Sequence, residues 1–308
     1  MHSANPIGRV AIIGFGEAGG VFGQDLAVAG MQVRVFDILF DSNRQRQPML
    51  RKAQACGVTA TRSLRDCLHK ADLVISAVTA SSALDVAREA GSILARGQRF
   101  LDINSVSPLT KRKAAGYIAR KGARFVEAAV MSAVPKHRLQ VPMLLGGPHA
   151  FEAAEYLQSI GMNAKPLSDQ VGVASAVKMC CSVVIKGLEA LAIESLFAAR
   201  IYGAENKVLE SLAASFPTMG WEDHLPDYLI SRVAEHGQRR AVEMHQAAQT
   251  LQHAGVEPMM ALATARRQEQ LVGEMAKRRV AYNPAGQFSW RSLSDAVARP
   301  PRRARSGR

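Results

Sequence analysis

Three glycines near the start of the chain have the spacing of a phosphate-binding turn. Gly14, Gly16 and Gly19 occur in the run GFGEAGG, directly after the apolar residues 10–13 and at the start of a helical stretch. In such a turn the first glycine permits a sharp bend, the second lets the backbone approach a pyrophosphate, and the third allows the helix to pack closely. The N–H groups at the helix N-terminus carry a partial positive charge that attracts phosphate. The residues predicted to bind a dinucleotide in this turn are Gly14, Phe15, Gly16, Glu17, Ala18 and Gly19.

An acidic residue after the second β-rich run bears on which dinucleotide is bound. Asp37 lies roughly 20 residues beyond the glycine turn, where an acid commonly binds the ribose hydroxyls of NAD. A carboxylate there accepts hydrogen bonds from the ribose diol and repels the 2′-phosphate of NADP. Arg44 and Arg46 follow, and they either reach such a phosphate or are simply solvated. The sequence therefore favours NAD as the cofactor and leaves NADP open.

A lysine in an apolar helical stretch is the residue best suited to move a proton. Lys178 has small and apolar neighbours in the sequence, and burial would lower the pKa of its amine. A neutral amine can take the proton of a substrate hydroxyl while a hydride leaves for a nicotinamide, and the ammonium form can return it. Ser182, one helical turn later, is expected to face the same way and to hydrogen-bond the substrate. The alternative is a lysine that extends from the start of a helix into solvent.

Polar residues also follow two of the predicted strands. Val78 and Thr79 end one strand, and Asn104 and Ser105 come just after the next. In open parallel sheets, ligands bind outside the carboxyl ends of the strands. Val78, Thr79 and Asn104 are therefore candidate contacts for the ribose or the nicotinamide, with ordinary loop capping as the alternative.

Two residues are candidates to anchor a substrate. Ser132 follows a predicted strand and could bind a carboxylate together with neighbouring backbone N–H groups. Arg240 lies in a predicted helix, and a guanidinium suits a bidentate contact with a carboxylate or a phosphate. A solvated side chain is the alternative at each position. We expect the partner to be a small molecule of anionic character.

The elements that would position these residues alternate between β-rich and helical segments over the first half of the chain. Near-continuous apolar strands between helices indicate a mainly parallel sheet that is covered on both faces. After about residue 171 the strand patterns end, and helical periodicity begins with a long segment, 172–202. The predicted fold class is α/β: an N-terminal Rossmann doubly wound sheet followed by an all-α domain joined by a long helix. Strands are expected at 10–13, 32–36, 73–78, 99–103, 124–127, 142–145 and 163–166, and later helices at 207–215, 226–253 and 259–279.

We expect three regions along the chain. Residues 1–170 would form the NAD(P)-binding domain, and 171–298 an all-α domain for substrate binding and dimerisation. Residues 299–308, RPPRRARSGR, are basic and nearly devoid of apolar side chains, which predicts a disordered tail.

Composition excludes several classes of protein. The chain has 308 residues and a formal net charge of +13, and much of the excess positive charge lies after residue 277. A basic tail can touch nucleic acid weakly but specifies no sequence, so we expect no specific nucleic-acid partner. No apolar run approaches the roughly 18–20 residues of a membrane span, and residues 1–8 lack the pattern of a signal peptide, so we expect a cytoplasmic protein without a membrane partner. The four cysteines lack the spacing of a zinc site, which predicts reduced, mostly buried thiols and no bound metal.

These motifs together resemble the β-hydroxyacid dehydrogenases, which include 3-hydroxyisobutyrate dehydrogenase and the 6-phosphogluconate dehydrogenases. The glycine fingerprint, the run NSVSP at 104–108 and Lys178 in a helix of small residues carry the resemblance. It implies that Lys178 is the catalytic acid/base and that the protein is a homodimer or a larger homo-oligomer. Ser182 stands where the family has asparagine, and Ala174 where it has a second glycine.

The substrate loop departs from the pattern of that family. The run EAAVMSA at 127–133 takes the place of the family's DAPVSGG. This run, the helix 178–187 and the segment 237–244 look more like a phosphogluconate-dehydrogenase-like subgroup whose C-terminal domain has no assigned function. The departure puts the substrate in question more than the chemistry.

Three functions fit the sequence. The first is an NAD(P)-dependent oxidoreductase that reversibly oxidises the alcohol of a hydroxy acid or a related small molecule, with Lys178 as general acid/base. The second is an imine reductase-like enzyme, which uses the same architecture but often replaces the lysine. The third is a non-catalytic nucleotide-binding protein, which would suit a chain without the lysine better than this one.

Overall fold

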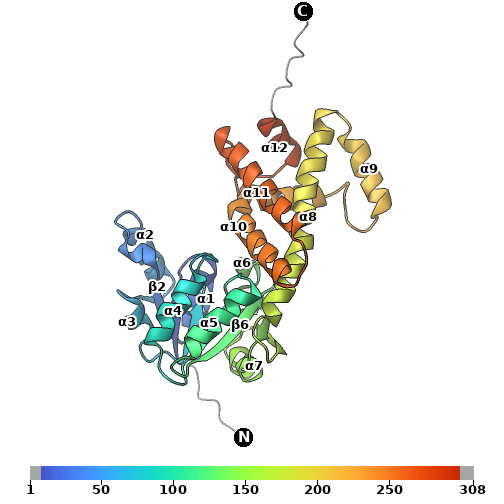
Figure 1. Ribbon diagram of the computed structural model, residues 1–308. Coiled ribbons are helices and arrows are strands. Elements are labelled where there is room, and N and C mark those ends of the chain that lie inside the picture. Colours follow the sequence, from blue (N-terminus) through green and yellow to red (C-terminus); the bar gives the residue numbers. More distant parts are fainter. Residues whose placement is uncertain (1–7, 299–308) are drawn as a thin grey trace, which may run out of the picture. The chain divides into compact units, whose positions relative to one another are not determined.

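The computed structural model describes residues 8–298 (Figure 1). The chain forms two compact units, one ending at Cys180 and the other beginning at Cys181. The division falls inside the long helix α8 (Val173–Ile201), whereas the change in sequence character near residue 171 precedes that helix. The predicted basic tail, 299–308, lies outside the described residues.

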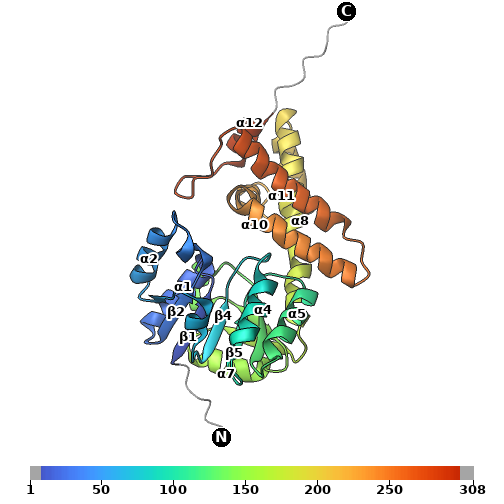
Figure 2. The same ribbon diagram turned by 60° about the vertical axis from the view of Figure 1, so that its left-hand side comes forward.

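The first unit is built on an eight-stranded sheet in the order β3-β2-β1-β4-β5-β6-β7-β8. Neighbouring strands are parallel except for β6 and β7, which are antiparallel. Figure 2 shows β1, β2, β4 and β5 side by side in this unit. The strands are β1 (Arg9–Ile13), β2 (Gln32–Phe36), β3 (Thr59–Ala60), β4 (Leu73–Ser76), β5 (Arg99–Asp102), β6 (Arg124–Val130), β7 (Met143–Gly146) and β8 (Ala164–Ser168).

Helices cover both faces of this sheet, because successive side chains of a strand point to opposite faces. On β1, Val10 and Ile12 belong to one buried apolar cluster, with residues of α1, α2 and α7. Ala11 and Ile13 belong to a second cluster, with residues of α3, α4 and α5. The helices of this unit are α1 (Glu17–Val28), α2 (Arg46–Ala55), α3 (Leu64–Leu68), α4 (Ala83–Ile93), α5 (Pro108–Ala119), α6 (Val134–His137) and α7 (Ala150–Ser159).

The predicted α/β fold class is confirmed, with two differences in the sheet. A short edge strand, β3, was not expected, because two residues carry too little pattern to be recognised. Strand β7 runs antiparallel to β6, whereas the sequence predicted a mainly parallel sheet and did not indicate this reversal of direction. The connection between them holds only the one-turn helix α6 and a 3-10 turn, Arg138–Gln140, so no long helix carries the chain back across the sheet.

The second unit is entirely helical over its described residues. A buried cluster that includes Leu196, Ile230, Leu271 and Trp290 forms its core. The helices predicted after residue 202 are present within two residues of their expected bounds, and a further short helix, α12, was not expected. Its eight residues are fewer than an amphipathic pattern needs to be recognised with certainty. Besides the later part of α8, this unit contains α9 (Glu205–Ser215), α10 (Leu225–His253), α11 (Met259–Lys277) and α12 (Trp290–Val297).

Across residues 8–298, no helix combines the length and the hydrophobicity that a bilayer span requires.

Candidate functional site

The glycine turn between β1 and α1 is shaped by close backbone packing. Gly14 has φ +90°, and a Cβ there would lie 2.5 Å from the carbonyl oxygen of Ala77. A Cβ at Gly19 would overlap the carbonyl oxygen of Gly14. At Gly16, by contrast, no atom lies within 4 Å of the place of a Cβ, so the backbone is bare on that side. This combination of two close approaches and one open position fits the pyrophosphate of a dinucleotide.

Asp37 is held in place at the end of β2 by two backbone groups. Its Oδ2 accepts a hydrogen bond from the N–H of Phe15 at 2.7 Å, and its Oδ1 accepts from the N–H of Leu39 at 2.9 Å. The carboxylate is therefore fixed beside the glycine turn, the place where a ribose diol is bound in this type of domain. The ring of Phe15 is fully buried, so this residue can offer a cofactor only its backbone.

Lys52, on α2, supports the same turn and was not singled out by the sequence. Its Nζ donates to the carbonyl oxygens of Phe15 and Gly16, both at 2.7 Å, and lies 4.6 Å from the centre of the Phe15 ring. Nothing in the sequence around Lys52 indicates this contact, because α2 meets the glycine turn only in the folded structure. Arg44 and Arg46 are both exposed.

Asn104 links the carboxyl ends of β4 and β5. Its Oδ1 accepts from the N–H of Val78 at 2.7 Å, and its Nδ2 donates to Ser76 Oγ at 2.9 Å and to Asp102 Oδ1 at 2.7 Å. The residue is buried, and both ends of its amide are engaged within the protein. Asn104 therefore shapes the β4–α4 loop, while Thr79 in that loop is exposed, with its hydroxyl near those of two serines.

A buried ion pair lies beneath this network. Lys111 Nζ lies 3.0 Å from Asp102 Oδ1 and donates to the carbonyl oxygen of Asp102 at 2.7 Å. Both side chains are 1% exposed, so the pair fixes the start of α5 against the end of β5. Neither residue was predicted, since only the meeting of helix and strand brings these charges together.

Lys178 reaches the same edge of the sheet from the first turns of α8. Its Nζ donates a hydrogen bond to Ser105 Oγ at 2.6 Å, and the side chain is half-buried. Ser105 follows β5 and Asn104, so the amine lies at the carboxyl end of the sheet. The β4–α4 loop, which contacts both Asn104 and the glycine turn, is at the same edge. The alternative of a lysine extended into solvent is not what the structure shows.

The three residues expected to bind substrate lie in different surroundings. Ser132 is exposed in the segment after β6, and Ser182 is buried on α8, four residues beyond Lys178. Arg240, on α10, has its guanidinium engaged by the carboxylate of Glu189. Because Glu189 is itself 1% exposed, the guanidinium compensates a buried carboxylate in this structure, and a contact of Arg240 with the substrate stays a prediction.

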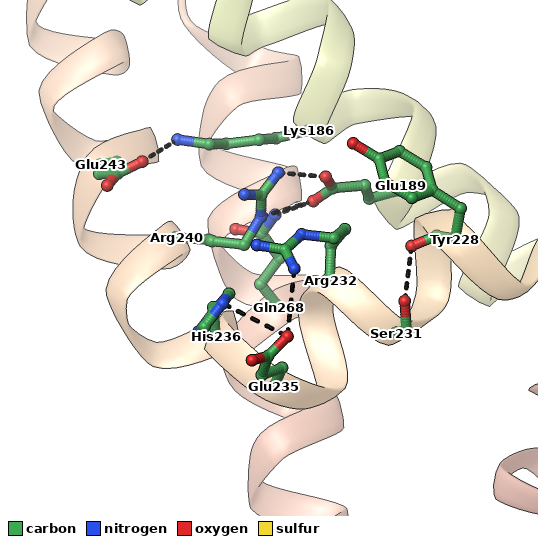
Figure 3. Close-up of polar contacts among 10 residues, drawn as sticks. All are labelled: Lys186, Glu189, Tyr228, Ser231, Arg232, Glu235, His236, Arg240, Glu243 and Gln268. Carbon is green, nitrogen blue, oxygen red and sulfur yellow. Dashed lines mark hydrogen bonds and ion pairs between the residues drawn. The ribbon is translucent and has the colours of Figure 1, made fainter. Parts of the chain in front are cut away.

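Figure 3 shows the polar cluster of the helical unit that takes up Arg240. Glu189 also accepts a hydrogen bond from Gln268 Nε2 at 3.3 Å, and the buried Lys186 pairs with Glu243. Burial raises the pKa of Glu189 and lowers the pKa of Lys186, because each charged form loses its solvation. Arg240 of α10 therefore compensates the buried carboxylate of Glu189 on α8, and Glu243 of α10 compensates the buried ammonium group of Lys186 on α8.

The cysteines depart from one expectation. None of the four is in a disulfide, but only Cys67 is buried, whereas Cys180 and Cys181 are exposed. Burial raises the pKa of the Cys67 thiol to about 12, so this thiol is unreactive. The prediction of mostly buried thiols was wrong, because Cys180 and Cys181 both lie on exposed parts of the surface of α8 and Cys56 is only partly buried.

The fold and the glycine turn define an NAD(P)-binding protein of the Rossmann class. Residues 9–169 match the family described as the NAD binding domain of 6-phosphogluconate dehydrogenase, and residues 199–271 match a domain of unknown function, DUF1932. The chain belongs to the 6-phosphogluconate dehydrogenase NAD-binding family, as its sequence motifs predicted.

Several relatives are similar to this chain in sequence, and for two of them the fold is similar as well. A conserved hypothetical protein from Sinorhizobium meliloti 1021 is 33% identical, with a TM-score of 0.73 over 94% of this chain and 96% of its own. The conserved protein MTH1747, whose structure was described as similar to 3-hydroxyacid dehydrogenases, is 31% identical, with a TM-score of 0.68 over 89% of this chain and 100% of its own. An uncharacterized 28.5 kDa protein from Methanothermus fervidus is 29% identical over 204 residues, 66% of this chain and 76% of that protein.

More distant structures share the fold alone. Mycobacterium tuberculosis 3-hydroxyisobutyrate dehydrogenase, solved with L-serine, is 16% identical, with a TM-score of 0.70 over 94% of this chain and 98% of its own. A reductive aminase from Aspergillus terreus, solved with NADPH and ethyl levulinate, is also 16% identical, with a TM-score of 0.55 over 94% of this chain and 99% of its own. One architecture thus serves both alcohol and imine chemistry, and the choice depends on the side chains of the site.

Proposed function

We propose that this protein is an NAD(P)-dependent dehydrogenase that reversibly oxidises the hydroxyl group of a small, anionic hydroxy acid, with Lys178 as general acid/base. The observation that carries the proposal is the position of the Lys178 amine, 2.6 Å from Ser105 Oγ at the carboxyl end of β5. This position supports a proton-transfer role for Lys178, because the amine lies at the edge of the sheet where the glycine turn would hold a dinucleotide.

The division of labour follows from the residues at that edge. The bound nicotinamide supplies the hydride acceptor for alcohol oxidation and the hydride donor in the reverse direction. Lys178, in its neutral form, takes the proton of the substrate hydroxyl, and its ammonium form returns a proton to the carbonyl oxygen. Ser105 accepts a hydrogen bond from the amine and so holds Nζ toward the reacting oxygen. Asp37 binds the ribose diol and favours NAD over NADP.

Two serines are the proposed polar contacts of the substrate. Ser132 is exposed after β6, and Ser182 follows Lys178 by one turn of α8. Hydroxyl groups at these places would hydrogen-bond a carboxylate or a second hydroxyl. An anionic substrate suits the modest excess of positive charge in the part of the chain before residue 277.

The test is a screen of hydroxy acids, sugar acids and aryl hydroxy acids with NAD and NADP, followed by NADH or NADPH absorbance. For a substrate found this way, Lys178→Ala should lower kcat by about 100- to 10,000-fold, because the proton-transfer group is lost. The Kd for NADH, measured by fluorescence, should stay near wild type, because the glycine turn is unchanged. Lys165→Ala, which removes an exposed lysine on β8, is the matched control and should leave kcat unchanged.

Two results would contradict the proposal. Unchanged turnover in Lys178→Ala would remove the acid/base role. Reduction of imines by the wild-type protein, without oxidation of any hydroxy acid, would point to the imine reductase-like alternative.

A further inference from the structure

A buried carboxylate lies at the start of the helix that carries Lys178. Glu127, on β6, is 0% exposed, and its Oε1 accepts hydrogen bonds from the N–H groups of Gly172 at 2.7 Å and Ala174 at 3.1 Å. The first N–H groups of a helix have no partner within the helix and carry a partial positive charge, so a carboxylate there is favourable. A residue 45 positions away in the sequence thus caps α8.

The surrounding backbone leaves room for this carboxylate and for nothing larger. Gly146, on β7, is the register partner of Glu127, and a Cβ at that position would overlap Glu127 Oε1. Gly172 has φ +108°, a conformation that favours glycine, which turns the chain so that its N–H points at the carboxylate. Two glycines on different segments therefore accommodate one side chain.

The contact lies one helical turn from the proposed catalytic amine. Ala174 and Lys178 are four residues apart on α8 and share a face of the helix. Lys178 in turn donates to Ser105, which follows β5, and the β5 residue Asp102 is the register partner of Glu127 on β6. The first turns of α8 are thus held at two points, by β6 at the helix start and by the end of β5 at the amine.

From this geometry we propose that Glu127 is a positioning residue: it fixes the first turn of α8 on β6 and thereby sets where the Lys178 amine lies. The proposal rests on the function proposed above for Lys178. A helix start that shifts would carry Nζ away from Ser105, and a displacement of about 1 Å at a reacting group can cost about 100-fold in rate.

Two substitutions of Glu127 distinguish the effect of its hydrogen bonds to α8 from the effect of the size of its side chain. Glu127→Ala removes the acceptor, and kcat should fall by about 10- to 100-fold, with the KM for the cofactor unchanged. Glu127→Gln keeps an acceptor oxygen for both amides, and kcat should stay within about fivefold of wild type, because a neutral acceptor is weaker than a charged one. Thermal denaturation and NADH binding show whether each variant is folded.

A second pair of variants reaches the same carboxylate without changing it. Gly146→Ala introduces a methyl group that overlaps Oε1, and it should lower kcat in the same direction as Glu127→Ala. Gly116→Ala, in α5, is the matched control, because no atom lies within 4 Å of its new Cβ. If Glu127→Ala does not fold, Gly146→Ala carries the test.

A readout that needs no substrate keeps this proposal separate from the proposed function. The rate of acylation of Lys178 by acetic anhydride, measured by mass spectrometry relative to Lys165 in the same sample, reports how the amine is held. The ratio should rise in Glu127→Ala and in Gly146→Ala, and it should stay near wild type in Glu127→Gln and Gly116→Ala. This holds whether or not Lys178→Ala affects turnover.

Two outcomes would overturn the positioning role. The first is a wild-type labelling ratio in folded Glu127→Ala or Gly146→Ala. The second is an equal change of the ratio in Glu127→Gln and Glu127→Ala, which would show that the charge and not the cap is what matters.

Discussion

At the scale of single residues, the site depends on polar groups that fix one another before any ligand is bound. Asp37 shows this for the cofactor: both oxygens of its carboxylate accept backbone N–H groups, from Phe15 and Leu39. Because these hydrogen bonds hold the carboxylate in one orientation, it favours the binding of a ribose diol and disfavours the binding of a 2′-phosphate.

We therefore expect Asp37→Ala to lower the preference for NAD. The ratio of kcat/KM for NAD to that for NADP should fall by about tenfold or more, since a hydrogen bond to a charged group and a repulsion are both lost. Steady-state kinetics with both cofactors measures this ratio. Asp41→Ala, at an exposed acid in the same loop, should leave it unchanged. A constant ratio in Asp37→Ala would remove the argument for NAD.

At the scale of elements, close approach of two helices shapes the second unit. Gly237 on α10 faces α11, and a Cβ there would lie 2.5 Å from Val272 Cγ2 and 3.2 Å from the carbonyl oxygen of Gln268. A side chain at position 237 would therefore have to displace Val272 or increase the spacing between these helices. Gln268, whose carbonyl oxygen lines this contact, also donates a hydrogen bond to the buried Glu189 of α8 through its side chain.

Gly237→Ala is expected to destabilise the helical unit by about 1–3 kcal/mol, because the extra methyl group overpacks the interface. Gly273→Ala, on α11, is the matched control: no atom lies within 4 Å of its Cβ, and the better helix former should stabilise by up to about 1 kcal/mol. Urea denaturation measures both. Stability equal to or above wild type in Gly237→Ala would show that the helices are not closely packed there.

Elements with many patterned residues were predicted well, and short or reversed ones were not. The long helices α8, α10 and α11 each repeat an apolar face over several turns, which is a strong signal. Strand β7 was located but not its direction, because alternating hydrophobicity is the same read forwards or backwards.

At the scale of the whole molecule, the long helix α8 presents apolar side chains to solvent. Val184, Ile185 and Leu191 are each more than half exposed, and Val184 and Leu191 lie two turns apart on one face. An exposed apolar face of this kind is costly to leave uncovered, which supports the expectation that the protein is a homodimer or a larger homo-oligomer.

Replacing this face should change the oligomeric state. We expect the double variant Val184→Glu and Leu191→Glu to shift the molecular mass in light scattering toward the monomer, because two charges would be buried in the interface. Val28→Glu, at an exposed valine of α1, is the control and should not alter the mass. A wild-type protein that is monomeric at all concentrations would contradict the expectation.

The sequence alone determined the features that neighbouring residues encode. The glycine turn, Asp37 behind it and the periodicities of strands and long helices are local patterns, and they sufficed to predict the fold class and the family. Tertiary structure decided which distant groups meet: Lys178 with Ser105 across 73 residues, Glu127 with Gly172 across 45, and Lys52 with Phe15 across 37. These contacts arise only when strands align at one edge of the sheet, and a linear pattern carries no record of that alignment.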